Sequence, residues 1–231
     1  MVVCSNKANY SLSGTNKQTL IMTLCLYPTD STTEFLRPVF ERICALPDVE
    51  PFEGDSIEDD CFLDNLYMAL EKAESVVFLG HGSTRCLYGT SLNPLIDDKS
   101  GNLDLLRNKK LVLFSCRSKD FIKEYNLHNG LGFGFIPTTL DDARDGRTLH
   151  KLDITILESL DLEAFKDSII RIWIRALSEH DFSNMSKFQK SFEFYTNVEI
   201  ADVLTTKHEL PNYRLVADML YYLFKDMTHI L

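Results

Sequence analysis

Uninterrupted apolar runs alternate with amphipathic segments along the first two thirds of the chain. The runs occupy 19–27, 75–79, 111–115 and 130–136, and their length and their content of Val, Ile, Leu and Phe are typical of strands buried on both faces. Helices are expected between them. Ser-Thr-Thr-Glu at 31–34 has the pattern of a capping box that opens a helix, and apolar residues recur at helical spacing again over 62–73.

The rest of the chain consists of segments without a periodic pattern of apolar residues and of a C-terminal part that is predicted to be helical. Residues 1–17 are predicted to be a flexible leader, 84–108 mostly irregular, and 141–147 a charged loop. Helical stripes of apolar residues then extend over 160–177, 186–204 and 213–227. The prediction is one domain over 1–231: a three-layer α/β/α sandwich around a mainly parallel sheet, with 181–231 as a helical C-terminal extension.

Composition narrows the range of functions. The chain has 231 residues, with 24 basic against 34 acidic side chains and a net charge of −10, which disfavours direct nucleic-acid binding. Its apolar runs are too short to cross a membrane. Six cysteines without any CxxC spacing favour free thiols in a reducing compartment, so the expected location is the cytoplasm, with no metal and no cofactor.

Two residues with catalytic potential stand directly after predicted strands. His81 follows the run 75–79, and Cys116 follows the run 111–115. Ligand sites of open α/β sheets lie at the carboxyl ends of the strands. The spacing between the two residues allows a crossover connection between neighbouring parallel strands, so both side chains are expected at one edge of the sheet.

A cysteine and a histidine in this position can carry out acyl transfer. A thiol of ordinary pKa is mostly protonated at neutral pH, and a neighbouring imidazole can take its proton. The thiolate attacks a peptide carbonyl to form a thioester, and fixed donors must stabilise the oxyanion. The backbone N–H groups of Gly82 and Cys116 are candidates for these donors. Cys86 is a competing thiol, but no predicted strand precedes it.

The motifs resemble those of the CHAT and caspase-like cysteine peptidases, the group that also includes separases, metacaspases and gingipains. The matching segments are Val-Val-Phe-Leu-Gly-His-Gly at 76–82 and Leu-Val-Leu-Phe-Ser-Cys-Arg-Ser at 111–118, and the Gly-Phe-Gly at 132–134 suits the next strand of that fold. The resemblance spans about residues 18–180, but its specific motifs cover only these short segments. It implies a caspase-like sandwich and cleavage of a protein substrate.

The resemblance also implies roles for individual residues. His81 corresponds to the general base and proton donor, Cys116 to the nucleophile, and Gly82 to the residue that helps to bind the oxyanion. One departure is clear, because caspases have Gln-Ala-Cys-x-Gly around the cysteine and this chain has Ser-Cys-Arg-Ser at 115–118. The sequence is therefore nearer the CHAT branch, whose modules are often fused to sensor domains. None is visible here, so a separate sensor or regulatory protein is the expected partner.

Four further residues are candidates for substrate contact. Ser83 and Ser118 are predicted turn or capping residues that could touch substrate. Asp141 and Asp142 either belong to a solvated loop or line the substrate pocket, in which case the site should prefer Lys or Arg before the cut. An apolar preference is the alternative. The segment 141–147 is also a candidate activation loop, displaced in the absence of a partner or substrate.

Two other functions fit parts of the pattern. Gly-His-Gly-Ser at 80–83 resembles the metal-binding motif of small tetrapyrrole chelatases, in which a histidine such as His81 binds the inserted metal. That reading leaves Cys116 without a role, and the motif would stand unusually far from the N-terminus. The third reading is a peptidase fold that has lost activity and serves as a binding module.

Overall fold

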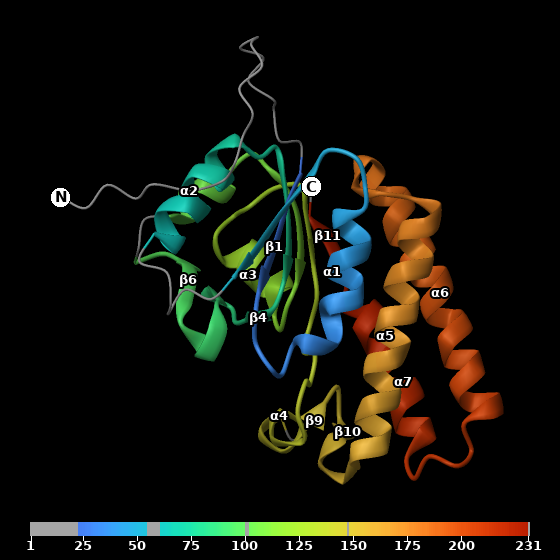
Figure 1. The fold of residues 1–231 in the computed structure, drawn as a ribbon. Helices are drawn as coiled ribbons and strands as arrows, with labels where there is room; N and C mark the ends of the chain where they lie inside the picture. Colours follow the sequence, from blue (N-terminus) through green and yellow to red (C-terminus); the bar gives the residue numbers. More distant parts are fainter. Residues whose placement is uncertain (1–22, 55–60, 100–101, 147, 231) are drawn as a thin grey trace.

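The computed structural model describes residues 23–54, 61–99, 102–146 and 148–230. The predicted leader 1–17 and the start of the predicted strand 19–27 lie outside them. Figure 1 shows a central twisted sheet with helices on both sides. In the described part of the chain, no helix combines the length and the apolar character needed to span a membrane.

The sheet has six strands in the order β11-β8-β7-β3-β1-β2. All neighbouring pairs are parallel except β11 with β8. The five parallel strands follow the 2-1-3-4-5 order of doubly wound α/β sheets, with a switch point between β1 and β3. The strands are β1 (Thr23–Pro28), β2 (Val49–Gly54), β3 (Ser75–Leu79), β7 (Lys110–Phe114), β8 (Gly130–Gly132) and β11 (Thr228–Ile230).

Side chains of the central strands alternate between two hydrophobic cores, as the period of a strand requires. On one face, Val77, Leu79 and Phe114 pack with the layer formed by α1 (Arg37–Cys44), α5 (Ser159–Glu179), α6 (Met185–Thr206) and α7 (Tyr213–Lys225). On the other face, Val76 and Phe78 pack with α2 (Phe62–Lys72) and α3 (Ser118–Glu124). A mainly parallel sheet covered by helices on both faces is therefore confirmed.

Three segments depart from the prediction because short strands left too weak a pattern. Residues 47–55, expected from the sequence to be a loop, contain the edge strand β2, in which Pro51 and Glu53 are exposed and no residue is fully buried. The expected irregular segment 84–108 contains the strands β5 (Cys86–Tyr88) and β6 (Pro94–Asp97), which form a small antiparallel sheet with β4 (His81–Gly82). The final strand, β11, has three residues, lies just beyond the helix predicted over 213–227, and was not predicted.

The charged segment 141–147 was predicted as a loop, and this is wrong for its described residues. They form α4 (Leu140–Gly146), while residue 147 lies outside the description. The reason is a reciprocal cap: the Asp142 amide donates to Thr139 Oγ1, and the Thr139 amide donates to Asp142 Oδ2. In Figure 1, α4 lies with the hairpin β9 (Thr148–Leu149) and β10 (Leu152–Asp153) below the sheet.

The helix after β1 also begins differently from the prediction. The capping box expected at 31–34 does not form, because Thr33 caps a short 3₁₀ helix, η1 (Glu34–Leu36), without a side-chain hydrogen bond. α1 follows directly, with a proline in its first turn. The side chain that organises this turn is instead Asp30, which accepts hydrogen bonds from the amide and the hydroxyl of Thr32.

The helical C-terminal part is fastened by one buried carboxylate. Asp161 is fully buried in the first turn of α5 and accepts from the Glu158 amide at 2.9 Å. It also accepts from the backbone amide and the side-chain amide of Asn212, each at 2.9 Å, at the start of α7. Asp161 thus joins the N-terminal ends of two helices that pack on the sheet.

Replacing Asp161 with Ala should lower the free energy of unfolding by about 3 kcal/mol, because it leaves three partly buried N–H donors without the acceptor that joins two helix starts. Asp167→Ala, at an exposed position on the same helix, should change it by less than about 0.5 kcal/mol. Guanidinium titration of both variants measures the difference. Equal stability of the two variants would contradict the role given to Asp161.

Candidate active site

His81 and Cys116 follow the paired ends of two adjacent parallel strands. β3 pairs with β7 in a register that places Leu79 beside Phe114. The Gly80 amide continues the pairing by donating to the Phe114 carbonyl at 3.2 Å. Each of the two residues lies two positions beyond the last paired residue of its strand, so both leave the sheet at the same level.

Both residues line one cavity at the carboxyl edge of the sheet. Its volume is about 560 Å³, and it is open to solvent on one side. Its wall combines the two strand ends with β5, the turn before β6, the segment after β8 and α4. The lining residues are His81, Gly82, Ser83, Thr84, Tyr88, Leu92, Cys116, Arg117, Phe135 and Asp142.

The backbones of the two strand ends approach closely at Gly82. A Cβ atom on this residue would collide with the Ser115 side chain and would lie 3.1 Å from the Cys116 carbonyl oxygen. Gly82 pairs with Leu87, next to the hydrogen-bonded pair of Ser83 and Cys86. Because hydrogen-bonded and non-hydrogen-bonded pairs alternate in an antiparallel ladder, the Gly82 amide points away from β5. It is therefore not used by this ladder.

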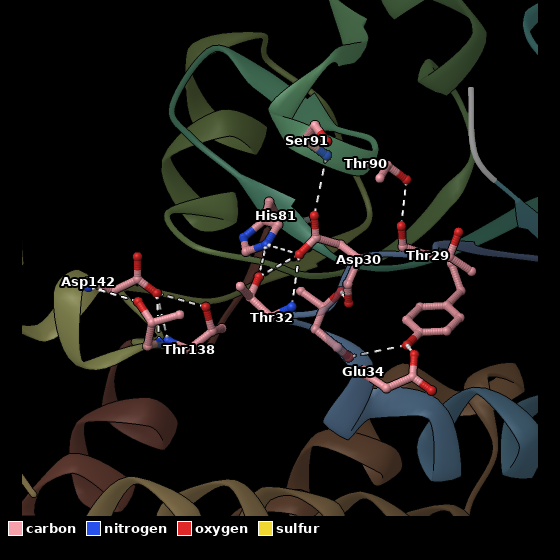
Figure 2. A network of polar contacts seen from close by, with 12 residues as sticks. Thr29, Asp30, Thr32, Glu34, His81, Thr90, Ser91, Thr138 and Asp142 are labelled. Carbon is pink, nitrogen blue, oxygen red and sulfur yellow. Dashed lines mark hydrogen bonds and ion pairs between the residues drawn. The ribbon is translucent and has the colours of Figure 1, made fainter. Parts of the chain in front are cut away.

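The His81 imidazole is held by the loop that follows β1. Its Nε2 lies 2.6 Å from Thr32 Oγ1 and 3.4 Å from Asp30 Oδ1. The side chains of His81 and Asp30 are only 18% and 16% exposed. Figure 2 shows this group of contacts, in which the Ser91 amide also donates to Asp30 Oδ2 at 3.3 Å.

Asp30 carries a negative charge in this arrangement. Burial alone would raise the pKa of its carboxyl group, but hydrogen bonds from Thr32 and Ser91 and the nearby His81 outweigh burial and lower the pKa. Its partner Thr32 donates a hydroxyl hydrogen bond of 2.6 Å to Oδ1. The histidine thus rests against a polar, anionic wall.

The Cys116 side chain is held by a different segment. Its Sγ donates to the Ile136 carbonyl at 3.0 Å and lies 3.3 Å from the Ile136 amide, which donates to it. The chain turns sharply from β7 into α3 at this point, with Arg117 in the left-handed region at φ 56°. The cysteine therefore stands at the turn, with its sulfur bonded to the backbone that follows β8.

The thiol is protonated in this state. Burial is the main cause that raises the pKa of Cys116 to about 11, and the Asp142 charge adds to it, although the Ile136 hydrogen bond and Arg117 act in the opposite direction. A thiolate is the reactive form of cysteine. The structure thus holds Cys116 in its unreactive, protonated form, hydrogen-bonded to Ile136, in the cavity that His81 also lines.

The two candidate serines have mainly structural contacts. Ser83 lines the cavity, yet its Oγ accepts from the Cys86 amide at 3.1 Å and shapes the turn between β4 and β5. Ser118 is fully buried and does not line the cavity. It donates to the Leu113 and Ser115 carbonyls and accepts from the Phe133 amide, so it fastens α3 to β7 and the end of β8.

The two candidate aspartates are placed differently from each other. Asp142 lines the cavity, and the hydrogen bonds that cap α4 lower its pKa although burial would raise it. Asp141 does not line the cavity. Its side chain is 85% exposed and forms an ion pair with Arg144 at 2.8 Å.

Among the cysteines that the structure describes, only Cys116 lines the cavity. Cys86 is buried in β5 away from the lining, donates to the Leu87 carbonyl, and has a pKa that burial raises to about 11. Cys25, Cys44, Cys86 and Cys116 are free thiols, but Cys61 is disulfide-bonded. The expectation of free thiols throughout is therefore wrong at Cys61.

The sequence reasoning missed Asp30 and Thr32. A usable signal was present, because Asp30 follows the first apolar strand just as His81 and Cys116 follow theirs. The segment was interpreted only as the start of a helix. As for metals, none of the described residues form a group of three or more His, Cys, Asp or Glu side chains suited to hold an ion.

The raised pKa of Cys116 predicts its reactivity in the resting protein. The rate of alkylation by iodoacetamide should rise about tenfold per pH unit from pH 8 to pH 10, because the thiolate fraction rises in that proportion below the pKa. Cys44, whose pKa is lowered by a hydrogen bond from Cys25, should level off at lower pH. Peptide-level mass spectrometry follows both sites, and a Cys116 rate that levels off below pH 9 would contradict the prediction.

The chain matches no family model, no curated protein and no solved structure. The likeness to caspase-like peptidases therefore depends on the two strand-end motifs and their placement. The structure contributes two further observations that no comparison supplies: the polar loop after β1, which contacts His81, and the cavity that His81 and Cys116 line.

Proposed function

We propose that the protein is a cysteine peptidase that cleaves a protein substrate, with Cys116 as nucleophile and His81 as general base. One observation carries the proposal. The two residues follow adjacent parallel strands at the same level and line the same open cavity. A cavity of this size accommodates a side chain and the backbone of an extended peptide beside the two groups.

The reaction begins when Cys116 Sγ leaves Ile136 and transfers its proton to His81. The thiolate attacks the peptide carbonyl carbon, and the oxyanion is stabilised by backbone amides at Gly82 and Cys116. His81 then donates the proton to the leaving amine, which leaves a thioester on Cys116. A water molecule, deprotonated by His81, hydrolyses the thioester and restores the thiol.

The resting geometry favours control by a separate protein. The sulfur is bonded to Ile136, and the same strand-to-helix segment continues into the capped α4 at the edge of the cavity. A partner that moves this segment would release the thiol and open the site. The candidate activation element is thus the short helix α4 with the segment before it, rather than a charged loop.

The assignment predicts the effect of four substitutions. Cys116→Ala should lower the rate of proteolysis by at least about 10³-fold. Cys116→Ser should lower it nearly as much, because His81 deprotonates a hydroxyl poorly. His81→Ala should also abolish turnover. Cys86→Ala should keep activity, since this thiol lies outside the cavity. The measurement is the set of new protein N-termini in cells that express each variant, with folding checked by circular dichroism.

The outcomes separate the alternatives. The same new N-termini with Cys116→Ala as with the wild type would end the peptidase proposal. Loss of cleavage only in Cys86→Ala would mean that the wrong thiol was chosen. Metal insertion that needs His81 but not Cys116 would favour a chelatase, and tight peptide binding without cleavage would favour an inactive binding module.

The position of Asp142 predicts the substrate preference of the proposed enzyme. The ionised carboxylate in the cavity wall should favour Lys or Arg before the cut. Asp142→Asn keeps an acceptor oxygen for the α4 cap and should lower the preference for basic over apolar side chains by about tenfold. Asp141→Asn, the exposed neighbour, should leave it unchanged. Peptide-library profiling measures both, and cleavage after Asp by the wild type would refute the idea.

A further inference from the structure

One local turn motif occurs three times in the described residues, and in only one copy does its side-chain hydroxyl contact a histidine ring at hydrogen-bond distance. In each copy an aspartate accepts from the amide and the hydroxyl of the second residue after it: Asp30 with Thr32, Asp153 with Thr155, and Asp181 with Ser183. The motif by itself is an ordinary device for shaping a turn. Its presence at Asp30 is therefore no sign of a site.

The first copy differs in what its hydroxyl contacts. Thr32 Oγ1 lies 2.6 Å from Asp30 Oδ1 and also 2.6 Å from His81 Nε2. Asp153 and Thr155 are exposed at the protein surface, whereas Asp30 and His81 are largely buried. Polar groups removed from water must satisfy one another, so the protons at Asp30, Thr32 and His81 are tightly constrained.

Counting the protons identifies the tautomer of His81. Asp30 is ionised, so its oxygens only accept. The single hydroxyl proton of Thr32 is donated to Asp30 Oδ1. Thr32 Oγ1 can therefore only accept from His81, and Nε2 must carry the ring proton. In a neutral imidazole the lone pair is then on Nδ1, which Figure 2 shows on the side of the ring away from Asp30.

Asp30 is itself held in place from a second direction. The Ser91 amide donates to its Oδ2, and the neighbouring Thr90 hydroxyl donates to the Thr29 carbonyl at 2.5 Å. The turn before β6 thus braces the loop after β1. Both oxygens of the Asp30 carboxylate therefore accept hydrogen bonds, which fix its position. A side chain can orient a neighbouring residue only when its own position is fixed.

We propose that Asp30 is a positioning residue, which acts through Thr32 to keep His81 protonated on Nε2 and to present Nδ1 to Cys116 as the base. The part played by Nδ1 rests on the proposed peptidase function, whereas the tautomer does not. When His81 takes the thiol proton, the Asp30 charge also stabilises the imidazolium ion. This links the carboxyl ends of three neighbouring strands, β1, β3 and β7, in one proton path.

The tautomer is tested by nitrogen NMR of the histidine rings in the resting protein, with the His81 signals identified by their loss in His81→Gln. The expected result is an Nε2–H ring in the wild type and in Asp153→Ala. In Asp30→Ala the Thr32 hydroxyl is free to donate to Nε2, so the Nδ1–H form should become populated. An Nδ1–H ring in the wild type, or no change in a folded Asp30→Ala, would overturn the proposal.

The positioning role is tested by peptide hydrolysis. Asp30→Asn keeps an acceptor for the turn but removes the charge, and it should lower kcat by about 100-fold with KM within about twofold. Asp153→Asn makes the same change in the same motif and should alter neither constant. Equal kcat in the two variants, or a change in KM alone, would refute positioning. No hydrolysis by the wild type would count against the peptidase function, and the NMR result would still decide the tautomer.

Discussion

The site depends on the parallel pairing of β1, β3 and β7. Parallel strands end at the same edge of a sheet, so residues that follow them are gathered there regardless of their distance in sequence. The pairing is held in register by strands buried on both faces, since a slip by one residue would exchange the two cores around Val77 and Phe78. The positions of Asp30, His81 and Cys116 thus follow from hydrophobic packing of the strands that precede them, with only Cys116 itself packed against a core.

The same burial sets the chemical state of the two central groups in opposite ways. Around Asp30, donors from Thr32 and Ser91 outweigh desolvation, and the carboxylate stays charged. Around Cys116, desolvation outweighs the single amide that Ile136 offers the sulfur, and the thiol stays neutral. His81 is hydrogen-bonded on the anionic side, through Thr32, while the Cys116 thiol is bonded to Ile136, so the resting arrangement is ordered and the thiol is in its unreactive form.

Sequence patterns predicted the parts of this structure that depend on long apolar runs. The strands before His81 and Cys116 each contain four consecutive apolar residues, a pattern that is typical of strands buried on both faces. The short strands β4, β5 and β11 have two or three residues and are defined by their partners, so no local signal marks them. Asp30 was overlooked because a turn motif and a helix cap use the same residue types.

For the proposed reaction, the free energies of ionisation and hydrogen bonding indicate what activation must change. A thiol with a pKa of about 11 instead of 9.0 needs about 2.7 kcal/mol more to ionise. Leaving Ile136 costs about 1 kcal/mol for a neutral hydrogen bond. A thiolate about 4 Å from an imidazolium gains roughly 4 kcal/mol at the effective dielectric of a protein surface. Contact with a correctly oriented His81 offsets these two costs, but moving the proton from a thiol to an imidazole of lower ordinary pKa costs about 3 kcal/mol more. In the proposed reaction, displacement of the segment around Ile136 must therefore be combined with further stabilisation of the charged pair, and the Asp30 carboxylate beside His81 is placed to supply it.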